Sequence, residues 1–234
     1  MNPPQDCRDC RVWTKSLFKD LDSQVIENLA DKKQIKKLVK KEALFTQGNE
    51  ITGIYCHMSG MAKVAQKDTK KKIRFSRLVL PGDTSGHRSL FIESSYKGTA
   101  YVISDKLMCC FIPKEEILHL LASQASFAKN LVIKIATELK RSENNHISVK
   151  EKTARSRFAE LMYDLCIEYS EQISEKQFLL KSELSKREIA SLLAVANETV
   201  IRLMSEMKAE NLIAYRDKKI LIVDIDKLKV SARL

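Results

Sequence analysis

The sequence has 234 residues, enough for two domains that each bury a core of their own. Its net charge is +11, and no stretch approaches the run of about 18 apolar residues that a membrane-spanning helix needs. The N-terminus MNPPQDCRDC lacks the apolar core of a signal peptide, so we expect a soluble, cytoplasmic protein with no membrane partner. The four histidines are scattered, and no nucleophile–base pair or paired carboxylates stand out, which disfavours an enzyme.

The excess positive charge is concentrated in the first two-thirds of the chain. Lysines cluster at 32–41, and a second basic group lies at 67–77. Such clusters suggest nucleic-acid binding, but solvated strand edges and a hairpin tip are the simpler explanation. The charge by itself therefore does not locate a partner surface.

All six glycines fall between residues 48 and 98, so tight turns are confined to that region. Short alternating segments at 54–58, 62–65, 73–80 and 99–103 are typical of strands separated by turns. Many short strands at regular spacing predict a β-sandwich or jelly roll. A short amphipathic helix is expected ahead of it, marked by apolar residues at helical spacing: Leu21, Val25, Ile26 and Leu29.

Residues 114–148 contain no glycine or proline, and their periodicity predicts one long helix. Its apolar stripe consists of Leu131, Val132, Ile135, Ala136 and Leu139. Either this stripe meets a second copy of itself in a homodimer, which we favour, or it packs against the chain's own sheet. We assign residues 1–113 to a sensor domain, 114–150 to a dimerisation helix and 151–234 to a C-terminal domain.

The last quarter of the chain carries the strongest motif. A helix is expected at 155–169, followed by a polar connection at 171–177. Ser185 and Glu188 then form a capping box that starts a helix, and a second helix follows a break at 194–196. That second helix, 197–209, is expected to bury one face: Val200, Leu203, Met204 and Met207. Two short helices with a tight turn form a helix–turn–helix, and a hairpin with strands 212–215 and 220–223 makes it a winged one.

The outward face of the second helix has side chains suited to base recognition. Arg202 offers a bidentate fork to guanine, and Glu198, one turn earlier, accepts from a cytosine amino group. A simple surface ion pair between these two residues is the alternative. We predict an interface with double-stranded DNA made by residues of both helices: Ser185, Lys186, Arg187, Asn197, Glu198, Thr199, Ile201 and Arg202.

At this point the sequence resembles the CRP/FNR family of bacterial transcription regulators along nearly its whole length. The matching strings are LFTQG at 44–48, GIY at 53–55, SG at 59–60, LPGD at 80–83, CFIP at 110–113 and ETVIR at 198–202. The resemblance implies an α+β fold: a β-roll (jelly roll) of the cyclic-nucleotide-binding type, a long dimerisation helix and a winged helix–turn–helix. Ala194 departs from it, because the turn often has glycine there.

The resemblance also implies a function. It predicts a sequence-specific transcription regulator that binds an inverted repeat as a homodimer, with RNA polymerase as a further partner. In that family the E-T/S-x-x-R string, here Glu198, Thr199 and Arg202, reads base edges. A β-roll sensor that acts through protein partners, with the C-terminal domain used for docking, is the alternative. The exposed pair of Glu198 and Arg202 favours the regulator.

The stretch PGDTSGHRSLF at 81–91 bears on the effector. Family members that bind cyclic AMP typically carry Glu directly after the glycine that corresponds to Gly86, and Arg before a later Ser/Thr. This chain has His87 at the first position and Lys97-Gly98 before Thr99. We therefore expect no cyclic-AMP binding of the family's usual kind, and leave open a different small effector or no ligand. The candidate effector contacts are Gly86, His87, Arg88, Ser89, Lys97 and Thr99.

Cysteines offer a second candidate sensor. CRDC at 7–10 resembles the start of the iron–sulfur ligand set in the FNR branch, and Cys110 falls near that branch's distant fourth ligand. The third position is Ser16, so a four-cysteine cluster is one ligand short. We expect no iron–sulfur cluster and no other cofactor. A redox switch between Cys7 and Cys10, or inert thiols, are the alternatives.

Overall fold

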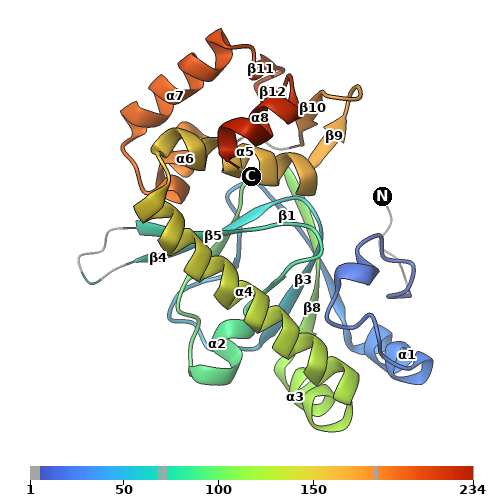
Figure 1. The fold of residues 1–234 in the computed structure, drawn as a ribbon. Coiled ribbons are helices and arrows are strands. Elements are labelled where there is room, and N and C mark those ends of the chain that lie inside the picture. Colours follow the sequence, from blue (N-terminus) through green and yellow to red (C-terminus); the bar gives the residue numbers. More distant parts are fainter. Residues whose placement is uncertain (1–5, 68, 70–72, 182–183, 234) are drawn as a thin grey trace. The chain divides into compact units, whose positions relative to one another are not determined.

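The computed structural model describes residues 6–67, 69, 73–181 and 184–233, with the backbone alone at 73–76 and 146 (Figure 1). The chain divides into two compact units, residues 1–140 and 141–234. The first is built around β-strands and the second mainly around helices, so the predicted α+β class is confirmed. Within the described ranges, every helix is too short or too polar to span a lipid bilayer.

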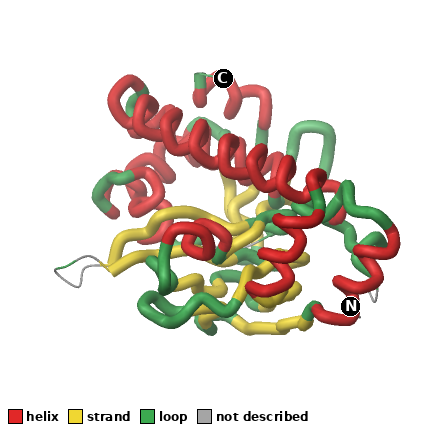
Figure 2. The backbone as a smooth tube through the Cα atoms, turned by 90° about the horizontal axis from the view of Figure 1, so that it is seen from below, coloured by secondary structure: helices red, strands yellow, loops and turns green. Residues whose placement is uncertain are grey.

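Two four-stranded antiparallel sheets form the first unit; the strands of the chain are drawn in yellow in Figure 2. One sheet has the order β1 (Gln34–Val39), β8 (Lys106–Pro113), β3 (Gly53–Ser59) and β6 (Thr84–Ser85). The other has the order β2 (Ala43–Phe45), β7 (Thr99–Val102), β4 (Ala62–Lys67) and β5 (Ile73–Val79). The predicted β-roll is confirmed, with β1, β2, β6 and β8 added to the expected strands.

The close approach of β3 to the backbone of β8 explains the glycine at position 53. Gly53 begins β3 opposite Pro113 of β8, and a Cβ at this position would lie 2.2 Å from the carbonyl oxygen of Ile112. Any side chain would push the two strands apart. Glycine at this point is therefore a packing requirement of the sheet.

Short helices flank the strands of the first unit. They are η1 (Trp13–Lys15), α1 (Ser23–Lys32), α2 (His87–Ile92) and α3 (Lys114–Ser123). The amphipathic helix expected near residue 21 begins at Ser23, so Leu21 lies just before it, although its side chain is buried with Ile26 and Leu29. The lysines at 32–41 lie on the end of α1 and along β1, and part of the basic group at 67–77 lies outside the described residues.

The single helix predicted over 114–148 is wrong in one respect. It is divided at Gln124, whose extended backbone separates α3 from α4 (Ala125–Glu151). The division redirects the chain so that both helices bury apolar residues in the same core: Ile117 and Leu120 of α3, Phe127 and Leu131 of α4. Periodicity alone did not reveal the break, because Ser123 and Gln124 are compatible with a helix.

The second unit contains α5 (Ala154–Glu168), α6 (Lys186–Leu193), α7 (Asn197–Ala209) and α8 (Ile225–Ala232). Its sheet has the order β11 (Ile213–Arg216), β12 (Lys219–Ile222), β10 (Phe178–Leu180) and β9 (Ser170–Gln172). The helix–turn–helix and wing are confirmed, with corrections to detail. The polar connection at 171–177 is part of the β9–β10 hairpin, and α8 was not expected.

The wing is tighter than predicted. Its strands extend through Arg216 and Lys219, which pair directly, so the loop is only Asp217 and Lys218 rather than residues 216–219. Both loop residues have positive φ, 49° and 64°, as a two-residue hairpin turn of type I′ requires. The basic side chains of Arg216 and Lys218 are consequently exposed at the tip of the wing.

Candidate nucleic-acid interface

The first helix of the motif begins with a complete capping box. The Glu188 amide donates to Ser185 Oγ at 3.2 Å, and the Ser185 amide donates to Glu188 Oε2 at 2.9 Å. These reciprocal bonds satisfy amide groups that a helix start leaves unpaired, and they fix where α6 begins. The predicted contacts Ser185, Lys186 and Arg187 are therefore held together at this end of the helix, all exposed.

The turn between the two helices is made by residues 194–196. Ala194 has φ 52° and ψ 47°, the left-handed conformation, and the Val195 amide donates to the Ala190 carbonyl at 3.0 Å. Alanine is strained in this conformation, where glycine is not. Ala196 returns to an extended conformation and starts α7.

The second helix divides cleanly into a buried and an exposed face. Val200, Leu203, Met204 and Met207 are buried, as predicted. Glu198, Ile201 and Arg202 are exposed, while Asn197 and Thr199 are half-buried. The Asn197 Oδ1 atom accepts no hydrogen bond from the described residues. The predicted base-reading residues thus lie at the first two turns of α7, where backbone amides also favour phosphate.

Arg202 pairs with a different carboxylate from the one considered from the sequence. Its Nη1 lies 2.7 Å from Glu206 Oε1, one turn further along α7, rather than beside Glu198. The Arg202 side chain is 65% exposed, and exposed pairs of this kind contribute less than about 1 kcal/mol. The guanidinium can therefore leave Glu206 at little cost when a stronger acceptor is offered.

In the first unit, the corner at Gly86 is filled by the chain itself. Gly86 has φ 89° and starts α2, and the fully buried His87 contacts Glu138 of α4, with 3.0 Å between Nε2 and Oε2. The same carboxylate oxygen accepts from Arg88 Nε at 2.7 Å. Arg77 and Lys134 lie 3.5 and 3.7 Å from the other oxygen. Glu138 was not singled out from the sequence, because it lies 51 residues from His87 and 50 from Arg88.

The electrostatics of this corner depend on burial and on Glu138. Burial lowers the pKa of His87, so the imidazole is neutral near pH 7 and donates from Nε2 to the carboxylate. Burial alone would raise the pKa of Glu138, but the hydrogen bond from His87 and the charge of Arg77 hold it well below its usual range. Glu138 is therefore a permanently charged acceptor at neutral pH.

The remaining candidate effector residues are bonded to one another or to other residues of the first unit. Lys97 is exposed and pairs with Glu93 at 3.0 Å, and its amide donates to Ser89 Oγ at 3.3 Å. The Thr99 hydroxyl accepts from the Gln47 amide at 3.0 Å. Each group therefore already has a partner within the first unit.

The predicted stripe on α4 is largely exposed, with one correction. Leu131 is buried in the core of the first unit, so it does not face outward. Val132, Ile135, Ala136 and Leu139 are exposed, Val132 at 66% and Leu139 at 58%. Their spacing of three and four residues places them along one side of the helix. Of the stripe, Leu131 alone is buried in the chain's own core.

Comparison with known families agrees with this geometry at both ends of the chain. Residues 156–230 match the Crp-like helix-turn-helix domain, and residues 35–124 match the cyclic nucleotide-binding domain. The chain belongs to the CRP/FNR family of transcription regulators. It is a CRP/FNR-type transcriptional regulator with a helix–turn–helix DNA-binding domain.

Curated relatives of this CRP/FNR regulator match along nearly the whole chain. The transcriptional activator protein FnrA of Stutzerimonas stutzeri is 26% identical over 220 residues, which cover 93% of this chain and 88% of that protein. The fumarate and nitrate reduction regulatory protein of Salmonella typhimurium is 23% identical over 228 residues, covering 97% and 90%.

Solved structures show the same fold. FixK2 from Bradyrhizobium japonicum superposes with a TM-score of 0.72 at 18% identity, covering 85% of this chain and 96% of that one. A CooA mutant from Carboxydothermus hydrogenoformans gives 0.70 at 19% identity, covering 93% and 95%. The fold is thus shared well beyond the level at which the sequences agree.

The cysteines of this CRP/FNR regulator gather around one cavity, but not as an iron–sulfur ligand set. Cys7, Cys10 and Cys110 line it together with Cys56, while Ser16 occupies the expected third position. Among the described residues, no group of three or more His, Cys, Asp and Glu is arranged to hold a metal ion. The cavity of about 40 Å³ has room for a few waters, not for four irons and four sulfides. As placed, these residues do not fit a cluster.

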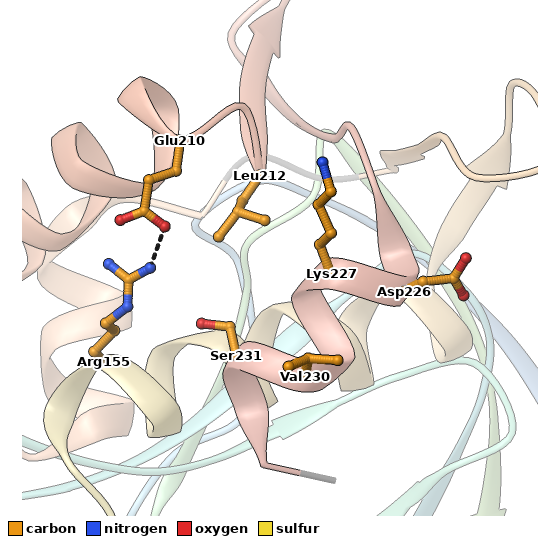
Figure 3. Close-up of a pocket in the computed structure, with 7 residues that line it drawn as sticks. All are labelled: Arg155, Glu210, Leu212, Asp226, Lys227, Val230 and Ser231. Atoms are coloured by element: carbon orange, nitrogen blue, oxygen red, sulfur yellow. Dashed lines mark hydrogen bonds and ion pairs between the residues drawn. The ribbon is translucent and has the colours of Figure 1, made fainter.

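A larger hollow lies in the second unit, apart from the predicted DNA contacts. Its volume is about 440 Å³, and Arg155 of α5 and Glu210 point toward each other across one side of it as an ion pair (Figure 3). The other lining residues are Leu212, Asp226, Lys227, Val230 and Ser231. Its lining includes apolar and charged residues, and none of the predicted DNA-binding residues belongs to it.

Proposed function

We propose that this CRP/FNR regulator acts in the cytoplasm as a homodimer that reads an inverted-repeat DNA site with α7. The observation that carries the proposal is the exposed face of α7, where Glu198, Ile201 and Arg202 lie beside one another on consecutive turns. Two copies related by a dyad would place their α7 helices in successive major grooves, with half-site centres about 10 bp apart.

Each residue has a distinct part in this proposal. Arg202 leaves Glu206 and donates to guanine O6 and N7, and Glu198 accepts from a cytosine amino group. Ile201 contacts a thymine methyl group, Thr199 faces the base edges with Glu198 and Arg202, and Asn197 flanks them at the start of α7. Ser185, Lys186 and Arg187, at the start of α6, hold the DNA backbone and set the register.

The exposed apolar stripe on α4 supports the homodimer. Val132, Ile135, Ala136 and Leu139 would remain in contact with water in a monomer, whereas a second copy of α4 would cover them. The sensor unit does not bind cyclic AMP in the family's usual way, because His87 replaces the ribose-binding carboxylate and Glu138 already occupies the corner. RNA polymerase is a further partner of the DNA-bound dimer.

A mobility shift on promoter DNA tests this function against docking to a protein partner. We expect a shift whose affinity falls steeply with salt, because lysines and arginines release counterions from the phosphates. Lys186→Ala should reduce the slope of log affinity against log salt by about 1, as expected for one lost phosphate contact. Lys208→Ala, at the far end of α7, is the matched control and should not change it. No shift at low salt with any duplex would favour the protein-partner alternative.

A further inference from the structure

Four of the six cysteines line one small apolar cavity of the first unit that has no part in DNA binding. These are Cys7 and Cys10 from the N-terminal segment and Cys56 and Cys110 from strands β3 and β8. Lys33 also lines it, and its Nζ donates a hydrogen bond to Cys7 Sγ at 3.2 Å. Thiols from three separate segments of the chain therefore meet beside one ammonium group.

The geometry of the N-terminal pair suits a disulfide. The Cys10 amide donates to the Cys7 carbonyl at 3.1 Å, which closes a four-residue turn. The Cα atoms at the ends of such a turn lie within about 7 Å of each other. Disulfides bridge Cα separations of about 4.4–6.8 Å. Cys7 and Cys10 can therefore be joined without moving the rest of the unit.

The strand pair is less suited to reaction. Cys56 and Cys110 lie directly opposite each other in the antiparallel register of β3 and β8. Burial raises the pKa of Cys110 to about 12 and that of Cys56 well above its usual value, so both remain protonated near neutral pH. Cys7, in contrast, accepts a hydrogen bond from the Lys33 ammonium group, which places a cation beside its sulfur.

We propose that Cys7 and Cys10 form a reversible dithiol–disulfide site that reacts with hydroperoxides, with Cys7 as the attacking thiol and Cys10 as the resolving one. This site goes beyond the proposed DNA-binding function and does not depend on it. It also accounts for a C-x-x-C pair that lies beside two more thiols and yet does not fit a metal cluster.

The reaction balances with a hydroperoxide as the only oxidant. The Cys7 thiolate attacks the peroxide, so an S–O bond forms and the O–O bond breaks. With hydrogen peroxide the leaving hydroxide takes a proton to become water, and with an organic hydroperoxide the leaving alkoxide takes a proton to become the alcohol. The Cys10 thiol then attacks the sulfenic sulfur of Cys7, so an S–S bond forms and water leaves. Two electrons pass from the two thiols to the peroxide. A dithiol reductant reverses the bond by exchange.

The N-terminal segment that carries Cys7 and Cys10 lies against α4, so oxidation of the pair would affect that contact. The segment that carries the pair packs on α4: the Phe18 and Phe127 rings lie 5.4 Å apart, and Asn130 Nδ2 donates to the Leu17 carbonyl at 3.2 Å. α4 also carries the exposed stripe formed by Val132, Ile135, Ala136 and Leu139. Oxidation would therefore act on a segment in direct contact with the helix proposed to form the dimer.

The test treats the reduced full chain with hydrogen peroxide and locates disulfides by mass spectrometry after alkylation. We expect the loss of two thiols, a disulfide peptide linking Cys7 to Cys10, and full reversal by dithiothreitol. Cys10→Ser should leave a sulfenic acid on Cys7 that dimedone traps, whereas Cys7→Ser should leave no trapped product on Cys10. Cys166→Ser, in the second unit, should react like the parent protein.

The rate provides a second, independent readout. Lys33→Gln should slow disulfide formation by about 3- to 10-fold, because the thiolate loses its ammonium partner. Lys32→Gln is the matched control, since Lys32 pairs with Glu116 instead and should leave the rate unchanged. An unchanged rate in Lys33→Gln, or a disulfide that joins other cysteines, would overturn the proposal. So would a visible chromophore formed with iron and sulfide and lost in Cys56→Ser, which would assign the cysteines to a cluster.

Discussion

Glu138 makes the contacts that hold the corner at Gly86 in the first unit. Its carboxylate faces His87, Arg88, Arg77 and Lys134, so Glu138→Gln removes the charge beside Arg88 and Arg77, whereas Lys134 keeps its second partner, Asp83, at 2.7 Å. We expect the free energy of unfolding of the first unit to fall by about 1–3 kcal/mol at pH 7. Trp13, the only tryptophan, lies in this unit and reports its unfolding by fluorescence.

The pH dependence of this effect has a definite sign. The pKa of Glu138 is lowered on folding, so its stabilisation is complete above the unfolded value of about 4.3 and is lost as pH falls below it. The difference between parent and variant should therefore shrink in acid. Glu93→Gln, which removes a half-buried carboxylate whose ion-pair partner among the described residues is the exposed Lys97, should show neither the loss nor the trend. A pH-independent difference for Glu138→Gln would contradict the charge assignment.

His87 leads to a prediction about ligands. Cyclic AMP at millimolar concentration should not raise the melting temperature of the first unit, because a ligand stabilises only a state that binds it. The group after Gly86 is a buried imidazole that donates to Glu138, not a carboxylate that could accept from ribose. Differential scanning fluorimetry measures this directly. A saturable upward shift would show that Glu138 yields the corner to the nucleotide.

Local residue contacts could be predicted from the sequence, and distant ones could not. The Ser185–Glu188 capping box spans three residues and was predictable from residue type and spacing. The contact between His87 and Glu138 joins residues that no local pattern relates. Cys56 was likewise not grouped with Cys7 from the sequence. Only the pairing of β3 with β8 brings Cys56 to the cavity that Cys7 lines.

Among the elements, the turn between α6 and α7 carries measurable strain. Ala194 has φ 52°, so Ala194→Gly should stabilise the second unit by about 0.5–1 kcal/mol. Thermal unfolding followed by circular dichroism measures the change. Ala209→Gly is the control of opposite sign, because Ala209 has helical geometry at the end of α7 and glycine there should destabilise by a similar amount. A loss of stability in Ala194→Gly would contradict the strained turn.

Helices and strands were predicted correctly where the apolar residues of a segment followed a single clear period. The apolar face of α7 followed the 3.6-residue period, and all four of its expected core residues are buried. The break at Gln124 escaped notice because the residues around it suit a helix, and only packing in a shared core divides α3 from α4. The β9–β10 hairpin escaped because its strands have three residues each, too few to show an alternating pattern.

For the whole molecule, assembly depends on the exposed stripe of α4. Leu139→Lys places a charge at one end of the stripe that we propose meets its own copy. We expect the dissociation constant of the dimer to rise by at least about tenfold, measured by sedimentation or light scattering across concentrations. Ile92→Lys, an exposed apolar site outside α4, should leave it unchanged. A parent protein that stays monomeric at all concentrations would contradict the dimer.

Base recognition by α7 is tested most directly by selecting bound duplexes from a random pool. The affinities of the Arg202→Ala and Lys186→Ala variants for the selected duplexes are then measured. We predict an inverted repeat with half-site centres about 10 bp apart. Arg202→Ala should cost about 1–3 kcal/mol per half-site and relax preference at one symmetric base position. Lys186→Ala should weaken all sequences about equally. No palindromic site, or two variants that lose affinity uniformly with specificity unchanged, would contradict base recognition by α7.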